Sequence, residues 1–191
     1  GASHATASIG RCLGSSDPYL VENAVLALEK LECNDHSLHK TMIKLLDDCR
    51  QSRRVIIQVL ASLNVTDSIA KINALLGDPS LPVGIRGASI AALVKLSNQK
   101  ELIEELRDNL KLANQMDRYC AVQDIINSGV YSLLDDVLVT PISPSFRIKA
   151  VSEFYNTSLS LGEERKLLSI LDSLIIDAPD SLDILHRYNF V

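Results

Sequence analysis

Apolar and small residues recur along this chain in five segments that share one spacing. From the first position of each segment they fall three, four and seven residues on, and in three segments also ten residues on. Positions at these offsets lie on one face of an α-helix. The first positions are 32, 33, 32 and 29 residues apart: Val21, Arg53, Arg86, Arg118 and Arg147. The pattern therefore predicts a helical repeat of about 32 residues.

A repeat of this length is typical of an α-solenoid, in which each unit buries its apolar face against its neighbours. We expect an all-α fold, a right-handed α-solenoid of about five helical hairpins. The expected repeats are 17–49, 50–80, 81–113, 114–141 and 142–178, followed by a C-terminal cap at 179–191. Residues 7–191 would form this single domain, and residues 1–6 would be a cloning scar outside it.

Helix start and stop signals agree with this division. Asp17-Pro18 and Asn34-Asp35 are residue types preferred at helix N-termini. We expect the first helix of the second repeat to end at Asn64, and that of the fourth repeat to end at Gly129. A last short helix is expected at residues 181–187.

The stretch before the first repeat is a weak cover for a solenoid end. Ala7–Ser16 is short and rich in Gly and Ser, and Ile9 and Leu13 are its only large apolar residues. Terminal repeats of a solenoid need a polar outer face or a partner. We therefore hypothesise that the N-terminal end packs on another subunit or another segment.

The composition narrows the class of protein. The chain has 191 residues, of which 47% are hydrophobic, and a net charge of −5. This fraction is typical of a folded protein, and the mild acidity argues against nucleic acid as a ligand. The four cysteines form no CxxC pair, and no apolar run reaches the length that a membrane span needs. We expect reduced thiols and a cytoplasmic protein without a membrane span.

The repeated arginines have two possible roles. Arg53, Arg86, Arg118 and Arg147 occupy the same position of successive repeats. They can form a structural ladder, each guanidinium bridging to a carboxylate or helix end of the neighbouring repeat. They can also form a row of cations that faces an acidic ligand, because guanidinium groups bind carboxylates in a bidentate manner.

The sequence contains no familiar catalytic or metal-binding pattern. Cys33, His36 and His39 have the residue types of a metal site, but no fourth ligand is evident. We therefore interpret the histidines as solvated and expect no metal. No P-loop, GxGxxG or GxSxG motif is present either.

The start of the fourth repeat is the most unusual segment. Residues 114–124 bring together two carboxylates, Asp117 and Asp124, an aromatic residue, Tyr119, and a thiol, Cys120. The simpler interpretation is a helix capped by Asp117 with a small buried cysteine. The functional interpretation is a binding spot that combines a stacking ring, an anion and a soft nucleophile.

Four segments resemble the E/F-type phycobilin lyases, which are HEAT-like repeat proteins of phycobilisome-containing phototrophs. These segments are DPYLVENAV (17–25), QSRRVIIQ (51–58), NQMDRYCAVQD (114–124) and PISPSFR (141–147). The resemblance covers nearly the whole chain from residue 17. It implies a HEAT-like solenoid that takes part in attaching an open-chain tetrapyrrole to a cysteine of a phycobiliprotein through a thioether.

The resemblance also implies ligands and partners. The bilin, phycocyanobilin or phycoerythrobilin, would be a substrate and not a permanent cofactor. The partners would be a phycobiliprotein subunit and a second HEAT-repeat chain of the lyase type. The isomerising branch of the family uses an adjacent His–Cys pair, whereas this chain has Tyr119 before Cys120. Isomerase activity is therefore not expected.

These ligands suggest roles for the candidate residues. Arg118, Arg86 or Arg147 would hold a propionate, and Asp117 or Asp124 would hold the pyrrole nitrogens. Tyr119 would stack on the conjugated plane, and Cys120 would hold the bilin transiently as a thioether adduct. Tyr119 and Cys120 are thus the candidate catalytic residues. The alternative is a non-catalytic HEAT-type scaffold or chaperone-like protein that binds a phycobiliprotein subunit.

Overall fold

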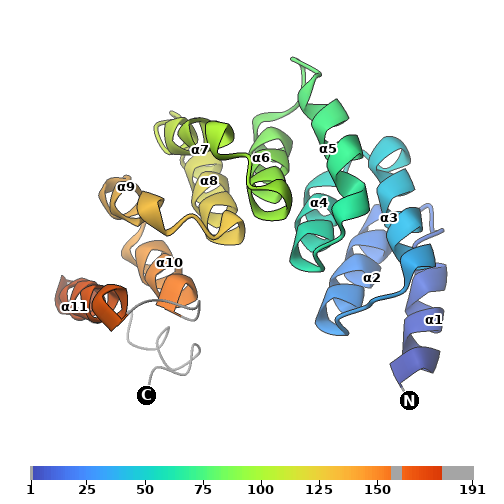
Figure 1. The fold of residues 1–191 in the computed structure, drawn as a ribbon, viewed down its shortest axis with the longest axis horizontal. Helices are drawn as coiled ribbons and strands as arrows, with labels where there is room; N and C mark the ends of the chain where they lie inside the picture. The colour runs from blue at the N-terminus through green and yellow to red at the C-terminus, as the bar shows by residue number, and fades with distance from the viewer. Residues whose placement is uncertain (1, 156–160, 178–191) are drawn as a thin grey trace. The chain divides into compact units, whose positions relative to one another are not determined.

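The computed structural model describes residues 2–155 and 161–177, and within these ranges all regular structure is helical. Figure 1 follows the helices from α1, in blue, to α11, in red. The expected all-α class is confirmed. The handedness of the solenoid stays a prediction, and the expected cap at 179–191, with its helix at 181–187, lies outside the described residues.

The chain divides into two compact units, Gly1–Leu102 and Ile103–Val191. In the first unit α4 is central, because it packs against α2, α3 and α6, while α5 packs on α6 and α1 on α2. Its core is almost entirely aliphatic. The helices are α1 (Ala2–Cys12), α2 (Pro18–Lys30), α3 (His36–Asp48), α4 (Arg53–Ser62), α5 (Ile69–Leu76) and α6 (Val83–Ser97), with 3₁₀ turns at Thr66–Ser68 and Lys100–Leu102.

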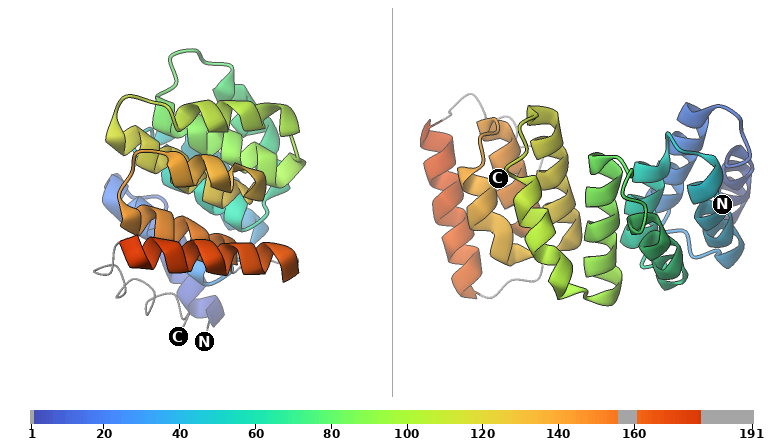
Figure 2. Two further views of the ribbon diagram at one scale, coloured as in Figure 1. Left: turned by 90° about the vertical axis from the view of Figure 1, so that its left-hand side faces the viewer. Right: turned by 90° about the horizontal axis from the view of Figure 1, so that it is seen from above.

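In the second unit α10 is central and packs against α8, α9 and α11, while α7 packs on α8. Figure 2 shows α10 and α11, in orange and red, lying alongside each other. The helices are α7 (Ile103–Asn109), α8 (Gln115–Ser128), α9 (Leu134–Val139), α10 (Pro144–Tyr155) and α11 (Leu161–Asp177), with a 3₁₀ turn at Tyr131–Leu133. The largest fully buried side chain of the described residues, Phe154, belongs to this unit.

Helix α1 is an element that the sequence pattern does not predict. It begins at Ala2, five residues before the expected start of the domain, and packs on α2. Leu13 is buried, and Gly10 lies so close to Leu38 that an added Cβ would be 2.6 Å from Leu38 Cδ2. The absence of a side chain at Gly10 lets α1 approach Leu38 of α3 closely. A further subunit at this end stays a hypothesis.

The first helix of four successive repeats ends in a left-handed residue. These residues, with φ between 47° and 72°, are Glu32, Asn64, Asn98 and Gly129. Behind two of them the chain closes a six-to-one hydrogen bond, from Cys33 N to Leu28 O (3.0 Å) and from Val65 N to Leu60 O (2.9 Å). This bond satisfies a carbonyl at the helix end. The predicted ends at Asn64 and Gly129 are confirmed, and each one turns the chain into the second helix of its pair.

We expect the same substitution at two glycines to have opposite effects. Gly129 has φ +72° and open space at the position that a Cβ would take, so Gly129→Ala should lower the free energy of unfolding by about 1 kcal/mol through backbone strain alone. Gly162 is also open but lies in α11, so Gly162→Ala should raise it by about 0.5 kcal/mol. Urea unfolding followed by circular dichroism measures both, and equal signs would contradict the backbone argument.

Candidate functional site

The sequence-predicted site lies on α8, and its first turn is ordered by Asn114. Asn114 is the N-cap, and its side-chain oxygen accepts a hydrogen bond from Met116 N at 2.8 Å. Asp117, the cap in the simpler interpretation, lies within the first turn and is half-buried. The simpler interpretation is therefore wrong about which residue caps the helix. A carboxylate in the first turn still stabilises a helix through the helix dipole.

Tyr119 joins α8 to α10. Its ring stacks on Phe146, with centroids 4.1 Å apart and planes 11° from parallel, and its hydroxyl accepts a hydrogen bond from Gln115 Nε2 at 2.8 Å. Phe146 lies in one of the family-like segments, yet sequence reasoning gave it no role. One face of Tyr119 is thus already covered. A flat ligand can reach only the remaining face or an edge of this aromatic pair.

The other candidate residues of α8 lie away from this aromatic pair. Asp124 is only 1% exposed, whereas Cys120 is half-buried. At about 100° per residue, Asp117, Cys120 and Asp124 share one side of α8, and Tyr119 points to a different side. The structure therefore groups the thiol with the carboxylates and not with the ring. The roles given to these residues stay predictions.

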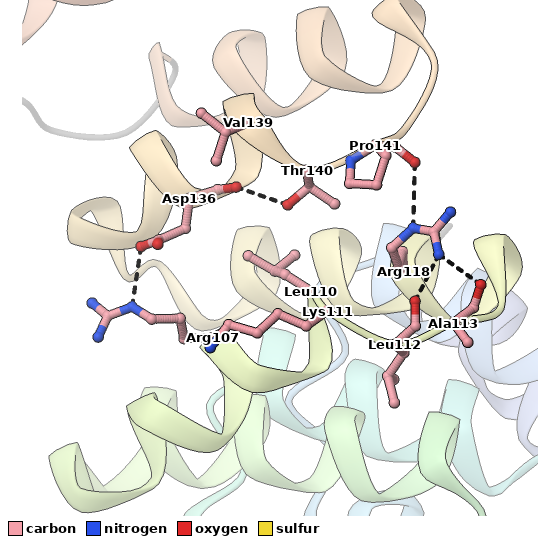
Figure 3. Close-up of a pocket in the computed structure, with 10 residues that line it drawn as sticks. All are labelled: Arg107, Leu110, Lys111, Leu112, Ala113, Arg118, Asp136, Val139, Thr140 and Pro141. Atoms are coloured by element: carbon pink, nitrogen blue, oxygen red, sulfur yellow. Dashed lines mark hydrogen bonds and ion pairs between the residues drawn. The ribbon is translucent and has the colours of Figure 1, made fainter.

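Arg118 connects two loops of the second unit. Its Nη1 donates to Leu112 O (2.6 Å) and Ala113 O (2.8 Å), and its Nε donates to Pro141 O (3.3 Å). Figure 3 shows these bonds; within the described part of the chain, Nη2 makes no hydrogen bond. Arg118 therefore has a structural role and keeps one NH₂ group that is able to bind a ligand.

A pocket with a volume of about 310 Å³ lies beside Arg118. Its apolar lining consists of Leu110, Leu112, Ala113, Val139 and Pro141. Its polar lining consists of Arg107, Lys111, Arg118, Asp136 and Thr140. All of these residues except Arg118 come from α7, α9 and the loops that follow them, and Figure 3 shows the ten around the pocket. The pocket is thus apolar on one part of its wall and mostly cationic on the other.

Ion pairs hold the cationic part of the pocket in place. Arg107 donates from Nε to Asp136 Oδ2 (3.1 Å) and from Nη1 to Glu104 Oε1 (2.7 Å). The hydrogen bond to Asp136, followed by that to Glu104, raises the pKa of Arg107 above its ordinary value. Lys111 pairs with Asp108 at 2.7 Å, and both side chains are largely exposed.

Comparison with known proteins finds two curated relatives that match nearly the whole of this chain. It is 37% identical over 185 residues to the bilin biosynthesis protein CpeY of Synechococcus sp. (strain WH8020), and the match covers 97% of this chain and 44% of that protein. It is 31% identical over 183 residues to an uncharacterized phycocyanin operon protein Y of Pseudanabaena tenuis (strain PCC 7409), covering 95% and 43%. The chain thus spans less than half the length of these relatives. No family model matches it.

A solved structure shares the fold. The complex of CpcE and CpcF of phycocyanin lyase from Nostoc sp. PCC7120 matches 90% of this chain and 68% of the solved chain, with a TM-score of 0.75 and 22% identity. The chain is a homologue of the E/F-type phycobilin lyases. The resemblance in the four sequence segments and the HEAT-like fold that it implied are both confirmed.

Each of the four ladder arginines of this lyase homologue makes a structural contact. Arg53 Nε donates to Leu46 O at 2.7 Å, at the end of the preceding helix α3. The other contacts are Arg86 Nη1 to Leu76 O (3.3 Å), Arg118 Nη1 to Leu112 O (2.6 Å) and Arg147 Nη2 to Thr140 O (3.1 Å). Each guanidinium thus caps the chain end of the second helix of the preceding pair. Binding of a propionate by Arg86 or Arg147 stays a prediction.

One histidine of the lyase homologue differs from our expectation. His39, interpreted as solvated, is buried, and its Nε2 lies 2.7 Å from Cys33 O. The hydrogen bond ties α3 to the turn before it, which explains why this polar ring is tolerated inside. The described residues contain no group of three or more potential metal ligands, and none of their helices is long and apolar enough to cross a membrane.

Tyr119 of the lyase homologue should have a pKa below the ordinary value of a tyrosine. The pKa of Tyr119 lies below its ordinary value of 10.0, mainly because the Ser143 hydroxyl donates a hydrogen bond to its phenol oxygen. Burial acts in the opposite direction and raises the pKa. The Ser143 N–H, Gln115 and the charge of Arg118 lower it further. Absorbance of the phenolate should show a step below pH 10 that Tyr119→Phe removes. Glu164 instead raises the pKa of Tyr155, so Tyr155→Phe should leave that early step in place.

The same shift has a consequence for stability. Between the folded pKa of Tyr119 and the ordinary value near 10, the unfolded chain binds more protons than the folded one. The free energy of unfolding of the wild type should therefore rise with pH in this window relative to Tyr119→Phe, and the gain should disappear as pH falls through the folded pKa. Parallel slopes for the two proteins would contradict the assignment.

Proposed function

We propose that this chain is part of a bilin lyase, which binds an open-chain tetrapyrrole and takes part in attaching it to a cysteine of a phycobiliprotein. The observation that carries the proposal is the 37% identity to CpeY over 97% of the chain. Because the chain spans 44% of that protein, the reaction, the substrates and the partners are proposed and not transferred directly.

The geometry of the second unit suits a flat ligand with acidic arms. The Tyr119–Phe146 pair offers an aromatic wall, and the Nη2 group of Arg118 is able to bind a carboxylate. These groups are held in place by α8, α10 and the loop between α9 and α10. Preorganised groups of this kind lower the entropy that binding costs.

The chemistry of attachment is an addition. The thiol S–H adds across a carbon–carbon double bond of the tetrapyrrole, so that one S–C and one C–H bond form and no group leaves. We propose that Cys120 first forms such an adduct and that reversal of the addition passes the bilin to the acceptor thiol. A thiolate is the attacking species, and a half-buried cysteine remains accessible for it.

We also propose two protein partners. One is the phycobiliprotein subunit that carries the acceptor cysteine. The other is a second HEAT-repeat chain, because the solved lyase that shares this fold is a complex of two chains, CpcE and CpcF. The bilin itself is a substrate, either phycocyanobilin or phycoerythrobilin.

The test is reconstitution of attachment in a heterologous host. This chain is co-expressed with a bilin-forming pathway and a phycobiliprotein subunit, with and without the second chain. Covalent bilin is measured by zinc-induced fluorescence of the denatured acceptor. We expect fluorescence that depends on this chain, and at least a tenfold loss with Cys120→Ser. The matched control is Cys12→Ser, since Cys12 is also half-buried but lies on α1.

Two outcomes would change the proposal. Full attachment with Cys120→Ser would leave a lyase that holds the bilin without a covalent adduct. Attachment that is unaffected by omission of this chain would remove the lyase function. The chaperone-like alternative would then remain. It is favoured by the ladder arginines, because they bind backbone carbonyls and not an acidic ligand. It predicts that this chain increases the amount of folded acceptor subunit when no bilin is present.

A further inference from the structure

We propose that the pocket between α7, α9 and their following loops is the site that binds one propionate arm of the tetrapyrrole. This inference rests on the proposed function and names a subsite of it. The pocket is distinct from the aromatic pair and shares only Arg118 with the site that the sequence predicted. None of its other lining residues belongs to that site.

The side chains that line this pocket still have N–H groups that can donate hydrogen bonds to a ligand. Arg118 uses Nε and Nη1 on carbonyls, and Arg107 uses Nε and Nη1 on Asp136 and Glu104, so an Nη2 group remains on each as far as residues 2–155 and 161–177 are concerned. The ammonium of Lys111 has three N–H groups and pairs with the one carboxylate of Asp108. An incoming group that accepts hydrogen bonds therefore fits, whereas a further donor does not.

The carboxylate of Asp136, which lines the pocket, is already paired with a cation. Asp136 accepts from Arg107 Nε, and its backbone oxygen accepts from Thr140 Oγ1 at 2.7 Å. Among the described residues Arg118 pairs with no carboxylate, and Asp108, the partner of Lys111, does not line the pocket. Guanidinium and ammonium groups in such a setting favour an anion, and a planar carboxylate suits the guanidinium fork.

The apolar part of the lining indicates that the anion is carried on a hydrocarbon arm. Val139 is 81% exposed, although it is an aliphatic residue at the end of α9. With Leu112 and Pro141 it forms an apolar rim next to the cations. A bare inorganic anion would leave this rim in water, whereas a propionate with its pyrrole ring covers it.

The size of the pocket limits how much of the ligand enters. Its volume of about 310 Å³ lies at the lower end of the range for small-molecule sites, which is about 300–1,000 Å³. One ring and its arm therefore enter, and the remaining rings stay outside. The loop that contains Pro141 also leads to Ser143 and Phe146, so the pocket adjoins the surface around Tyr119.

The experiment compares biliverdin, which carries two propionates, with its dimethyl ester, by titration of the visible absorbance of each. We expect the wild type to bind the acid at least tenfold more tightly than the ester. Lys111→Met, a change at a side chain that is 70% exposed, should weaken binding of the acid about fivefold and leave binding of the ester unchanged. Val139→Asp should also weaken binding of the acid about fivefold. Lys95→Met, on the exposed surface of α6, is the matched control and should change nothing.

The outcomes separate the subsite from the function. Equal affinity for acid and ester, or an equal effect of Lys111→Met on both, overturns the subsite and leaves tetrapyrrole binding intact. If biliverdin does not bind, hexanoate is titrated into labelled protein and followed by NMR. Saturable shifts at residues 107–113 and 139–141 then support a carboxylate site while the tetrapyrrole function fails. The absence of such shifts overturns both.

Discussion

Replacing Phe154 with alanine should lower the free energy of unfolding by about 4 kcal/mol. Phe154 is 1% exposed and lies in α10, the helix that packs against α8, α9 and α11. Its ring meets Tyr131 edge to face, with centroids 6.0 Å apart. Alanine would remove both the buried apolar surface and this contact, and would leave a cavity that the neighbouring helices cannot fill without moving.

Two variants test the cavity argument for Phe154. Phe154→Leu keeps most of the volume and should cost less than half as much, about 1.5 kcal/mol. Val139→Ala removes methyl groups from an exposed aliphatic residue of the same unit and should stay within about 0.5 kcal/mol of the wild type. Urea unfolding followed by circular dichroism gives all three values. A loss below about 2 kcal/mol for Phe154→Ala would contradict the burial that the structure describes.

The second large effect is expected at Arg118, where a methionine should cost about 2–3 kcal/mol. Arg118→Met removes three hydrogen bonds from a charged donor to the carbonyls of Leu112, Ala113 and Pro141. The loop before α8 and the loop before α10 lose their common anchor. Amide hydrogen exchange should therefore accelerate in both loops, although α8 and α9 separate them along the chain.

Arg118→Lys and Arg53→Met show whether geometry or charge is decisive. Lysine keeps the charge but has no rigid fork, so Arg118→Lys should recover less than half of the loss. Arg53 binds a single helix end, because it donates only to Leu46 O and Asp47 O within the described residues. Arg53→Met should therefore lower the free energy of unfolding by about 1 kcal/mol. Amide hydrogen exchange should accelerate in one loop only. Full recovery by lysine would indicate that the positive charge alone stabilises these loops.

The repeat was readable in the sequence because its signals are local. Apolar positions at helical spacing predicted the first helix of each pair, and Asp17, Asp35 and Asn64 begin or end helices where their side chains or backbone conformations require it. Helix α1 escaped the same reasoning. Its contribution depends on Gly10 meeting Leu38, which belongs to another helix.

Local sequence signals predicted only part of the candidate site. A helix was correctly expected after Asp117, but it already begins at Gln115 with Asn114 as its cap, and helical rotation separates Tyr119 from Cys120. Phe146 was missed because it is 27 residues from the ring on which it stacks. A pattern along one helix contains no information about which residue of another helix faces it.

The linear order of residues was sufficient for the all-helical class, the repeat length and the register of the arginines. The helical spacing is a pattern within about ten residues, and the repeat is visible because this pattern recurs about every 32 residues along the chain. The packing of helices settled what those residues do. It directed the arginines to carbonyls of the preceding pair, closed the ring of Tyr119 against Phe146, and brought Arg107, Lys111, Arg118 and Asp136 around one pocket. These contacts join loops that are separated by whole helices, and only burial of the apolar faces between those helices brings them together.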